Sequence, residues 1–144
     1  MKLTSEATLQ IQKPIAEVFE GIVNPDILTK YFISESTGRL QSGVDLKWKF
    51  PEFADWYPVT SVLVEDLKSV SFVWDADTVV KIVLESLPDL STIITVTEGA
   101  KELNDENLKW LVGNSGGWSN FLACMKAYLE YGVQLRKGAF DFLR

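Results

Sequence analysis

Four short stretches in the middle of the chain alternate apolar and polar residues, and this alternation restricts the possible folds more than any other feature. In residues 45–50, "DLKWKF", the residues Leu46, Trp48 and Phe50 share one side. Residues 70–75, 79–85 and 91–98 repeat the spacing, and their apolar side holds Val70, Phe72, Trp74, Val80, Ile82, Leu84, Ile94 and Val96. A period of two is typical of β-strands with one buried face. The polar turns between the stretches indicate antiparallel hairpins.

The segment before these strands predicts one further strand and two short helices. Residues 3–12 alternate in the same way as the central stretches. Residues 13–23, "KPIAEVFEGIV", change to helical spacing with a proline near the start. In residues 24–32, "NPDILTKYF", Asn24 is the expected N-cap and Pro25 the first helical residue.

The last third of the chain predicts a long helix with a wide apolar face. In residues 116–132, "GGWSNFLACMKAYLEYG", a seam at spacings of four, three and four contains Trp118, Leu122, Met125 and Leu129. The residues that widen it to about half of the circumference are Phe121, Cys124, Tyr128 and Leu135. A face this broad suits a helix held in the palm of a curved sheet. We expect Cys124, the single cysteine, to be an inert packing thiol.

Glycines set the expected limits of this helix. "GNSGG", residues 113–117, predicts a break between a short helix near residues 105–112 and the long helix. Gly132 falls inside the apolar face, where glycine costs about 1 kcal/mol relative to alanine. Either a close approach to a strand or a kink that shapes a cavity would explain it. Arg136 and Lys137 then suit the helix C-terminus, and Gly138 is expected to end the helix.

Composition excludes several classes of function. The 144 residues contain no histidine and one cysteine, so Ser-His-Asp and Cys-His catalysis and histidine-rich metal sites are absent. A net charge of -6 disfavours nucleic acid as a partner. No apolar run reaches the roughly 18 residues that span a bilayer, and the N-terminus does not resemble a signal peptide. We expect one cytoplasmic domain over residues 1–144, as a monomer or weak homodimer, without a cofactor or metal.

The order of these elements is that of an α+β helix-grip fold, in which a curved antiparallel sheet wraps a long C-terminal helix. The sequence also resembles the activator of heat-shock-protein-90 ATPase homologue branch of the START-like (SRPBCC) superfamily. The similar segments are "IQKPIAEVFEGIVNPDILTKYF", "VTSVLVEDLKSVSFVWD" and "TIITVTEG" followed by "GGWSNFLACMKAYLEYG". The resemblance implies this fold and a cavity between helix and sheet. The chain departs from the family at Tyr31, where a tryptophan is usual, and at Glu98, where some relatives carry histidine.

The aromatic inner face predicts either a filled core or a ligand pocket. The expected pocket residues are Trp48, Phe50, Phe72, Trp74, Ile94, Glu98, Trp118, Leu122 and Met125. We expect the indoles of Trp48, Trp74 and Trp118 to converge in one interior. An empty apolar cavity of about 300 Å³ would cost roughly 7 kcal/mol, so a pocket must be small, hydrated or filled by a ligand. Glu98 is expected to face the same, inner side of its strand as Ile94 and Val96. Its side chain then either reaches solvent or orients a polar group of a ligand.

Two further segments allow alternative interpretations. Residues 50–58, "FPEFADWYP", are expected to form a loop over the pocket entrance or an exposed patch for a partner, and the candidate entrance residues are Tyr31, Trp56 and Tyr57. Asp75 and Asp77 in "DADT" have the composition of a hairpin turn and lack the spacing of a calcium loop.

Three functional hypotheses follow. The first is the binding of a small, largely hydrophobic molecule without a reaction, so that the protein is not an enzyme. The second, implied by the resemblance, is interaction with a chaperone of the heat-shock-protein-90 class and stimulation of its ATPase. The third is a cyclase- or hydrolase-type enzyme that uses Glu98 or a tyrosine as acid or base, which requires a carboxylate buried in the pocket beside a second polar group.

Overall fold

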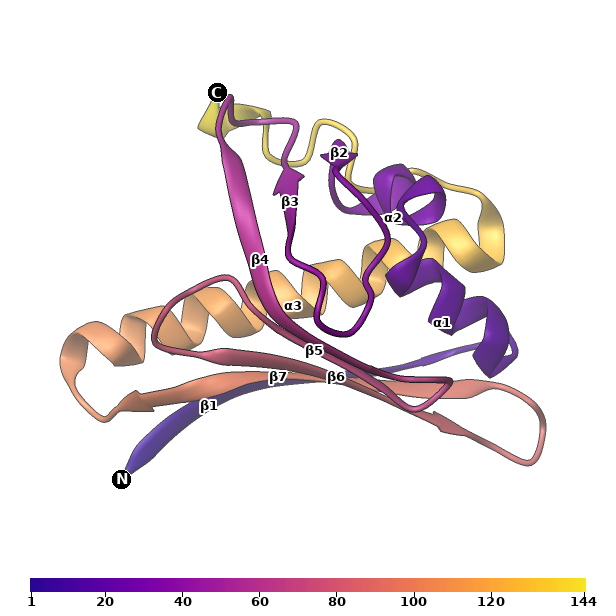
Figure 1. The fold of residues 1–144 in the computed structure, drawn as a ribbon, viewed down its shortest axis with the longest axis horizontal. Helices are drawn as coiled ribbons and strands as arrows, with labels where there is room; N and C mark the ends of the chain where they lie inside the picture. Colours follow the sequence, from indigo (N-terminus) through magenta and orange to yellow (C-terminus); the bar gives the residue numbers. More distant parts are fainter.

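The computed structural model describes all residues, 1–144, and shows one long helix lying across a curved sheet (Figure 1). The elements in chain order are β1 (Lys2–Ile11), α1 (Ile15–Val23), α2 (Pro25–Tyr31), β2 (Glu35–Ser36), β3 (Leu46–Lys49), β4 (Trp56–Glu65), β5 (Ser69–Val73), β6 (Val79–Ser86), β7 (Thr92–Glu102), α3 (Asp105–Tyr131) and a short 3-10 helix, η1 (Asp141–Leu143). None of the helices is both long and apolar enough to cross a bilayer.

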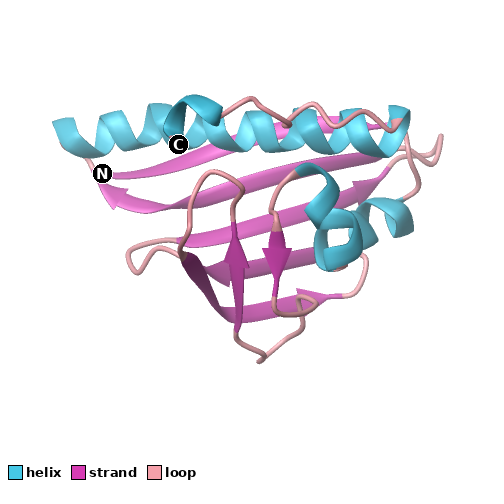
Figure 2. Cartoon of the chain, turned by 90° about the horizontal axis from the view of Figure 1, so that it is seen from above, coloured by secondary structure: helices cyan, strands magenta, loops and turns pink.

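The strands form one antiparallel sheet in the order β1-β7-β6-β5-β4-β3-β2. The first strand therefore pairs with the last one, and α3 lies along these two strands while β4, β3 and β2 curl up on the other side (Figures 1 and 2). The helices α1 and α2 close one end of this trough. The predicted helix-grip arrangement is confirmed.

The predicted alternation decides which side chains of the sheet are buried. Leu46 and Trp48 of β3, Val70 and Phe72 of β5, Val80, Ile82 and Leu84 of β6, and Ile94 and Val96 of β7 all lie in one continuous hydrophobic core. The loop predicted for residues 50–58 is wrong for its last three residues. Trp56, Tyr57 and Pro58 begin β4 and pair with Lys49, Trp48 and Lys47 of β3.

The predicted helix break at residues 113–117 is also wrong, because α3 continues through all three glycines. Asn104 caps the helix, and its side chain accepts a hydrogen bond of 2.8 Å from the backbone N–H of Asn107. Each interior glycine costs about 1 kcal/mol. This cost is smaller than the stabilisation that the helix gains from its N-cap and from the packing of its later residues.

The end of α3 differs from the prediction as well. Gly132 ends the helix with a left-handed backbone (φ 67°), and its own N–H donates to the carbonyl of Tyr128 at 2.9 Å, which is the αL type of helix end. An added Cβ at Gly132 would meet nothing within 4 Å, so neither a close approach nor a kink explains this glycine. The backbone requirement explains it instead.

The residues after Gly132 therefore form a separate C-terminal tail, residues 133–144. Leu135 is not part of the apolar face of α3, because it lies in this tail and is 52% exposed. Arg136 and Lys137 are outside the helix and do not complement its C-terminus, and Gly138 (φ 78°) lies in a turn of the tail.

Candidate functional site

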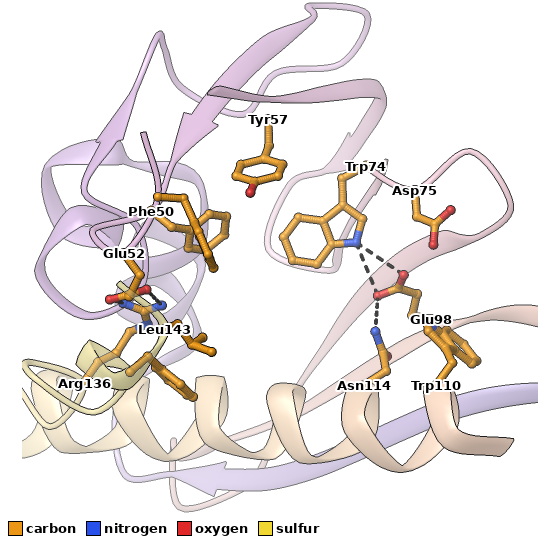
Figure 3. A pocket seen from close by; sticks show the side chains of 12 residues that line it. Phe50, Glu52, Tyr57, Trp74, Asp75, Glu98, Trp110, Asn114, Arg136 and Leu143 are labelled. Carbon is orange, nitrogen blue, oxygen red and sulfur yellow. Dashed lines mark hydrogen bonds and ion pairs between the residues drawn. The ribbon is translucent and has the colours of Figure 1, made fainter. Parts of the chain in front are cut away.

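A cavity of about 440 Å³ opens between the first half of α3, the turns that follow β3 and β5, and the C-terminal tail (Figure 3). Aromatic side chains make up much of its wall, and charged groups lie at both ends. The residues that line it are Phe50, Glu52, Phe53, Tyr57, Trp74, Asp75, Glu98, Trp110, Asn114, Arg136, Phe140 and Leu143.

Glu98 is the buried polar group of this cavity. It continues the inward-facing series of Ile94 and Val96 on β7, and only 1% of its surface is exposed. Its Oε1 accepts hydrogen bonds from Asn114 Nδ2 and Trp118 Nε1, both at 3.0 Å. Its Oε2 accepts one from the Thr78 hydroxyl at 2.7 Å, and Trp74 Nε1 lies 3.3 Å from both oxygens.

These contacts tie together four parts of the fold. Trp74 and Thr78 flank the β5–β6 turn, Asn114 and Trp118 lie one turn apart on α3, and Glu98 belongs to β7. Asn114 also accepts a hydrogen bond from the Ser5 hydroxyl of β1. Glu98 thus holds the two indole rings in fixed orientations, because an indole N–H can only donate and Glu98 is its acceptor.

The opposite end of the cavity is closed by an ion pair. The guanidinium of Arg136 donates two hydrogen bonds to the carboxylate of Glu52, at 2.7 and 3.1 Å. The two side chains are 13% and 3% exposed. The guanidinium also lies 5.7 Å from the ring centre of Phe50 and 5.0 Å from that of Phe140. Bidentate geometry together with stacking is the combination that arginine provides and lysine does not.

This ion pair attaches the tail to the body of the protein. The backbone hydrogen bonds made by residues 134–144 all stay within the tail. Its only half-buried residues are Arg136 and Phe140, and the others are exposed. The tail therefore covers the cavity through side chains, those of Arg136, Phe140 and Leu143, while the backbone of residues 134–144 makes no hydrogen bond to the sheet or to α3.

A second ion pair lies beside Glu98. Lys101 Nζ is 3.3 Å from the carboxylate of Asp75 and 5.0 Å from the ring centre of Trp110. The backbone N–H of Asp77 donates to Asp75, and this bond, assisted by Lys101, lowers the pKa of Asp75. Asp75 and Asp77 thus form the predicted turn. Nowhere in the structure do three His, Cys, Asp or Glu side chains come close enough to hold a metal ion.

The structure divides the predicted pocket residues into two groups. Phe50, Trp74 and Glu98 line the large cavity, and Trp118 lines an adjoining space of about 230 Å³. The other five residues do not line these spaces and are packed in the core, the alternative that the sequence left open: Trp48, Phe72, Ile94, Leu122 and Met125. The three indoles converge as predicted, with ring centres 6.0 Å apart for Trp48 and Trp74 and 5.3 Å apart for Trp74 and Trp118.

Of the three predicted entrance residues, only Tyr57 lines the cavity. Trp56 lies outside it, with Lys49 Nζ 5.8 Å from its ring centre. Tyr31 is a core residue, 1% exposed, and its hydroxyl donates a hydrogen bond of 2.7 Å to the carbonyl of Gly21. Burial raises the pKa of Tyr31 well above its ordinary value, and burial also raises the pKa of the Cys124 thiol, as expected for an inert packing residue.

Sequence reasoning did not name eight lining residues, although the first two fall in the segment predicted to lie over the entrance: Glu52, Phe53, Asp75, Trp110, Asn114, Arg136, Phe140 and Leu143. Two of them carried a readable signal. Trp110 and Asn114 precede Trp118 at steps of four, so they continue its face toward the helix N-terminus. The supposed break at residues 113–117 hid this continuity. The tail residues had no periodic signal, because the tail is not a regular element.

Comparison with solved structures supports the fold. The protein SSP2350 from Staphylococcus saprophyticus is 29% identical, with a TM-score of 0.83 over 93% of this chain and 96% of that one. The Aha1 dimer from Colwellia psychrerythraea is 18% identical, with a TM-score of 0.75 over 90% of this chain and 98% of that one. The chain is thus similar over nearly its whole length to proteins with a helix-grip fold.

DynU16, from the dynemicin biosynthetic locus, is also similar, with 19% identity and a TM-score of 0.79. The chain covers 48% of that protein. No protein-family profile and no curated protein sequence matches the chain. At these identities the likeness to DynU16 and to the Aha1 protein concerns the fold alone.

Proposed function

We propose that this protein binds a small, largely apolar molecule in the cavity above Glu98. The observation that carries the proposal is an aromatic-walled space of about 440 Å³ with one buried carboxylate at its base, held by hydrogen bonds to four side chains. Ligand sites are commonly apolar clefts of about 300–1,000 Å³ with a few fixed polar groups. The wall rings supply apolar contact area, and Glu98 supplies a fixed direction for a polar group of the ligand.

The arrangement favours a receptor over an enzyme. Glu98 does lie buried beside other polar groups, Asn114 and Thr78, which is the geometry that the catalytic hypothesis required. However, a carboxylate has about four acceptor positions, and four donors already occupy most of them. A general base needs a lone pair aimed at the proton that it removes, and only Oε2 keeps acceptor capacity, because the other positions are committed to partners that hold the fold together. We therefore assign Glu98 a binding and organising role.

Binding can be tested by mass spectrometry of small molecules that co-purify with the native protein, followed by a panel of hydrophobic ligands monitored by tryptophan emission and melting temperature. Trp110→Leu removes a ring from the cavity wall and should weaken binding of any ligand found. The matched control is Trp56→Leu, which removes an exposed ring outside the cavity and should leave affinity unchanged. Failure of every compound to shift either signal would refute the proposal.

A second candidate is the interaction with a chaperone that the family resemblance implies. Membership of the activator of heat-shock-protein-90 ATPase homologue branch remains our proposal, supported by the sequence segments described above and by the similar fold of the Aha1 protein from Colwellia psychrerythraea. The specific observation in its favour is that Phe53 and Trp56, three residues apart, are each 41% exposed.

This candidate predicts a surface-dependent effect on ATP turnover. The chaperone of the same organism should hydrolyse ATP faster in the presence of this protein, and the double substitution Phe53→Ser/Trp56→Ser should remove the stimulation. The control is Val112→Ser, which replaces an exposed apolar residue on α3, 75% exposed. Unchanged ATP turnover with the unmodified protein would exclude this function.

A further inference from the structure

The charges that line the cavity are not all balanced. Three carboxylates and one guanidinium face it, from Glu52, Asp75, Glu98 and Arg136. Glu52 is neutralised by Arg136 and Asp75 by Lys101. Glu98 has no such partner, because every group bonded to it is a neutral indole, amide or hydroxyl. The most buried carboxylate of the site is thus the one without a counter-charge.

Burial makes this imbalance important. A carboxylate that leaves water needs hydrogen bonds and usually also an opposite charge, and buried charges without a partner are rare in proteins. The neutral donors meet the first need of Glu98, whereas nothing in the chain meets the second. Its Oε2 retains acceptor capacity, since its only close partner is the Thr78 hydroxyl and it shares Trp74 Nε1 with Oε1.

The walls around Glu98 suit a positively charged group. Trp74 and Trp110 stand at the same end of the cavity as Glu98, and Tyr57 and Phe50 complete the wall toward Arg136 (Figure 3). The faces of aromatic rings attract cations, most strongly in the case of tryptophan. The chain already shows this chemistry nearby, since the ammonium of Lys101 lies over the ring of Trp110 and against the carboxylate of Asp75.

We propose that the ligand of this cavity is an arylalkylamine, an aliphatic amine that carries an aromatic ring, whose protonated nitrogen binds Glu98 Oε2 beside the indoles while its ring system fills the apolar space. This inference rests on the proposed function and adds the chemical class of the ligand. A primary or secondary ammonium fits better than a quaternary one, because it can donate a hydrogen bond to the remaining acceptor position. The amine supplies the counter-charge that Glu98 lacks.

A matched pair of probes tests this class. The amine is 2-(2-naphthyl)ethylamine, and its neutral counterpart is 2-(2-naphthyl)ethanol, which has nearly the same shape and can also donate a hydrogen bond. Isothermal titration calorimetry on the full chain should give an amine affinity higher by about tenfold or more, the range expected for a charge-assisted bond with a cation–π contact. In NMR spectra the indole N–H signals of Trp74 and Trp118 should shift with the amine.

Substitution of Glu98 identifies the cause of the preference. Glu98→Gln keeps the shape and removes the charge, so the two probes should bind within about twofold of each other. The control is Glu102→Gln, the same change on the same strand at an exposed carboxylate outside the cavity, which should keep the preference. If Glu98→Gln does not fold, Trp110→Leu provides the second test and should weaken the amine more than the alcohol.

The outcomes separate the two proposals. Equal binding of amine and alcohol to the unmodified protein, or tighter binding of the alcohol, overturns the inference and leaves the proposed binding function in place. A preference that survives Glu98→Gln overturns it as well, because another group must then recognise the charge. If neither probe binds, the inference fails, and the binding function fails with it only when the wider panel of neutral compounds also fails.

Discussion

Residues 118–131 of α3 are packed into the sheet, whereas residues 105–117 of the same helix form the wall of a cavity. The second half contributes all five buried residues of the helix, Trp118, Phe121, Leu122, Cys124 and Met125. The first half contributes none, carries three glycines, and presents Trp110 and Asn114 to the open space. One helix thus contributes to the core at one end and forms the wall of a cavity at the other.

The difference follows from what lies opposite each half. The second half faces α1, α2 and the closed end of the trough (Figure 1), and its buried side chains belong to the hydrophobic core. The first half faces the turns after β3 and β5, whose side chains stop short of the helix and leave the cavity. The tail covers this gap through side chains alone. Stability and ligand binding should therefore respond to different substitutions along one helix.

The largest expected effect is in the packed half. Met125→Ala removes a side chain that is 0% exposed and should lower the free energy of unfolding by about 2–5 kcal/mol. Leu108→Ala, in the first half and 42% exposed, should change it by less than about 0.5 kcal/mol. Urea denaturation of both variants measures the difference. Similar losses would mean that the two halves contribute equally to the core.

A smaller effect is expected from the ion pair that fastens the tail over the open half. Arg136→Met breaks the bonds to Glu52, but release of the tail lets water reach the Glu52 carboxylate, so the free energy of unfolding should fall by only about 1 kcal/mol. The protection of the tail against proteolysis should fall far more, so that limited proteolysis removes residues 133–144 faster than in the unmodified protein.

The matched control for this change is Lys137→Met, which removes the same charge from the neighbouring, exposed residue. Its cleavage rate should equal that of the unmodified protein. Equal cleavage of the Arg136→Met variant and the unmodified protein would show that Phe140 alone holds the tail in place.

The packed half was predictable from sequence, and the open half largely was not. Period-two spacing in the strands and a seam through Trp118, Leu122 and Met125 are local patterns that burial imposes directly, so the core followed from them. Residues that line a cavity need not follow a periodic pattern, because burial does not impose one on them. Glu52 and Arg136 are 84 positions apart, and nothing periodic in the sequence connects them.

The glycines were misread for a related reason. Glycine weakens a helix locally, and a sequence gives no measure of the tertiary packing that offsets this cost. "GNSGG" therefore resembled a break, although Asn114 inside it reaches Glu98 and helps to hold the helix in place. Gly132 resembled an interior residue, although the change to a left-handed backbone there ends the helix. Both errors arose because glycine was interpreted from its residue type alone, whereas its backbone angles decide whether it continues a helix or ends it.

The smallest expected effect distinguishes two of these glycines. Gly116 and Gly117 both have free space where a Cβ would stand, so Gly116→Ala and Gly117→Ala should each raise the free energy of unfolding by about 0.5–1 kcal/mol. Only Gly117, together with Gly113, borders the space next to Trp118. Gly117→Ala should therefore weaken the binding of a ligand that fills this space, whereas Gly116→Ala should not. Thermal melts with and without ligand compare the two variants directly. Equal ligand affinities of the two variants would place the ligand in the larger cavity alone. A loss of stability in both variants would mean that the glycines relieve a strain in residues 105–117 of α3 that the backbone geometry does not show.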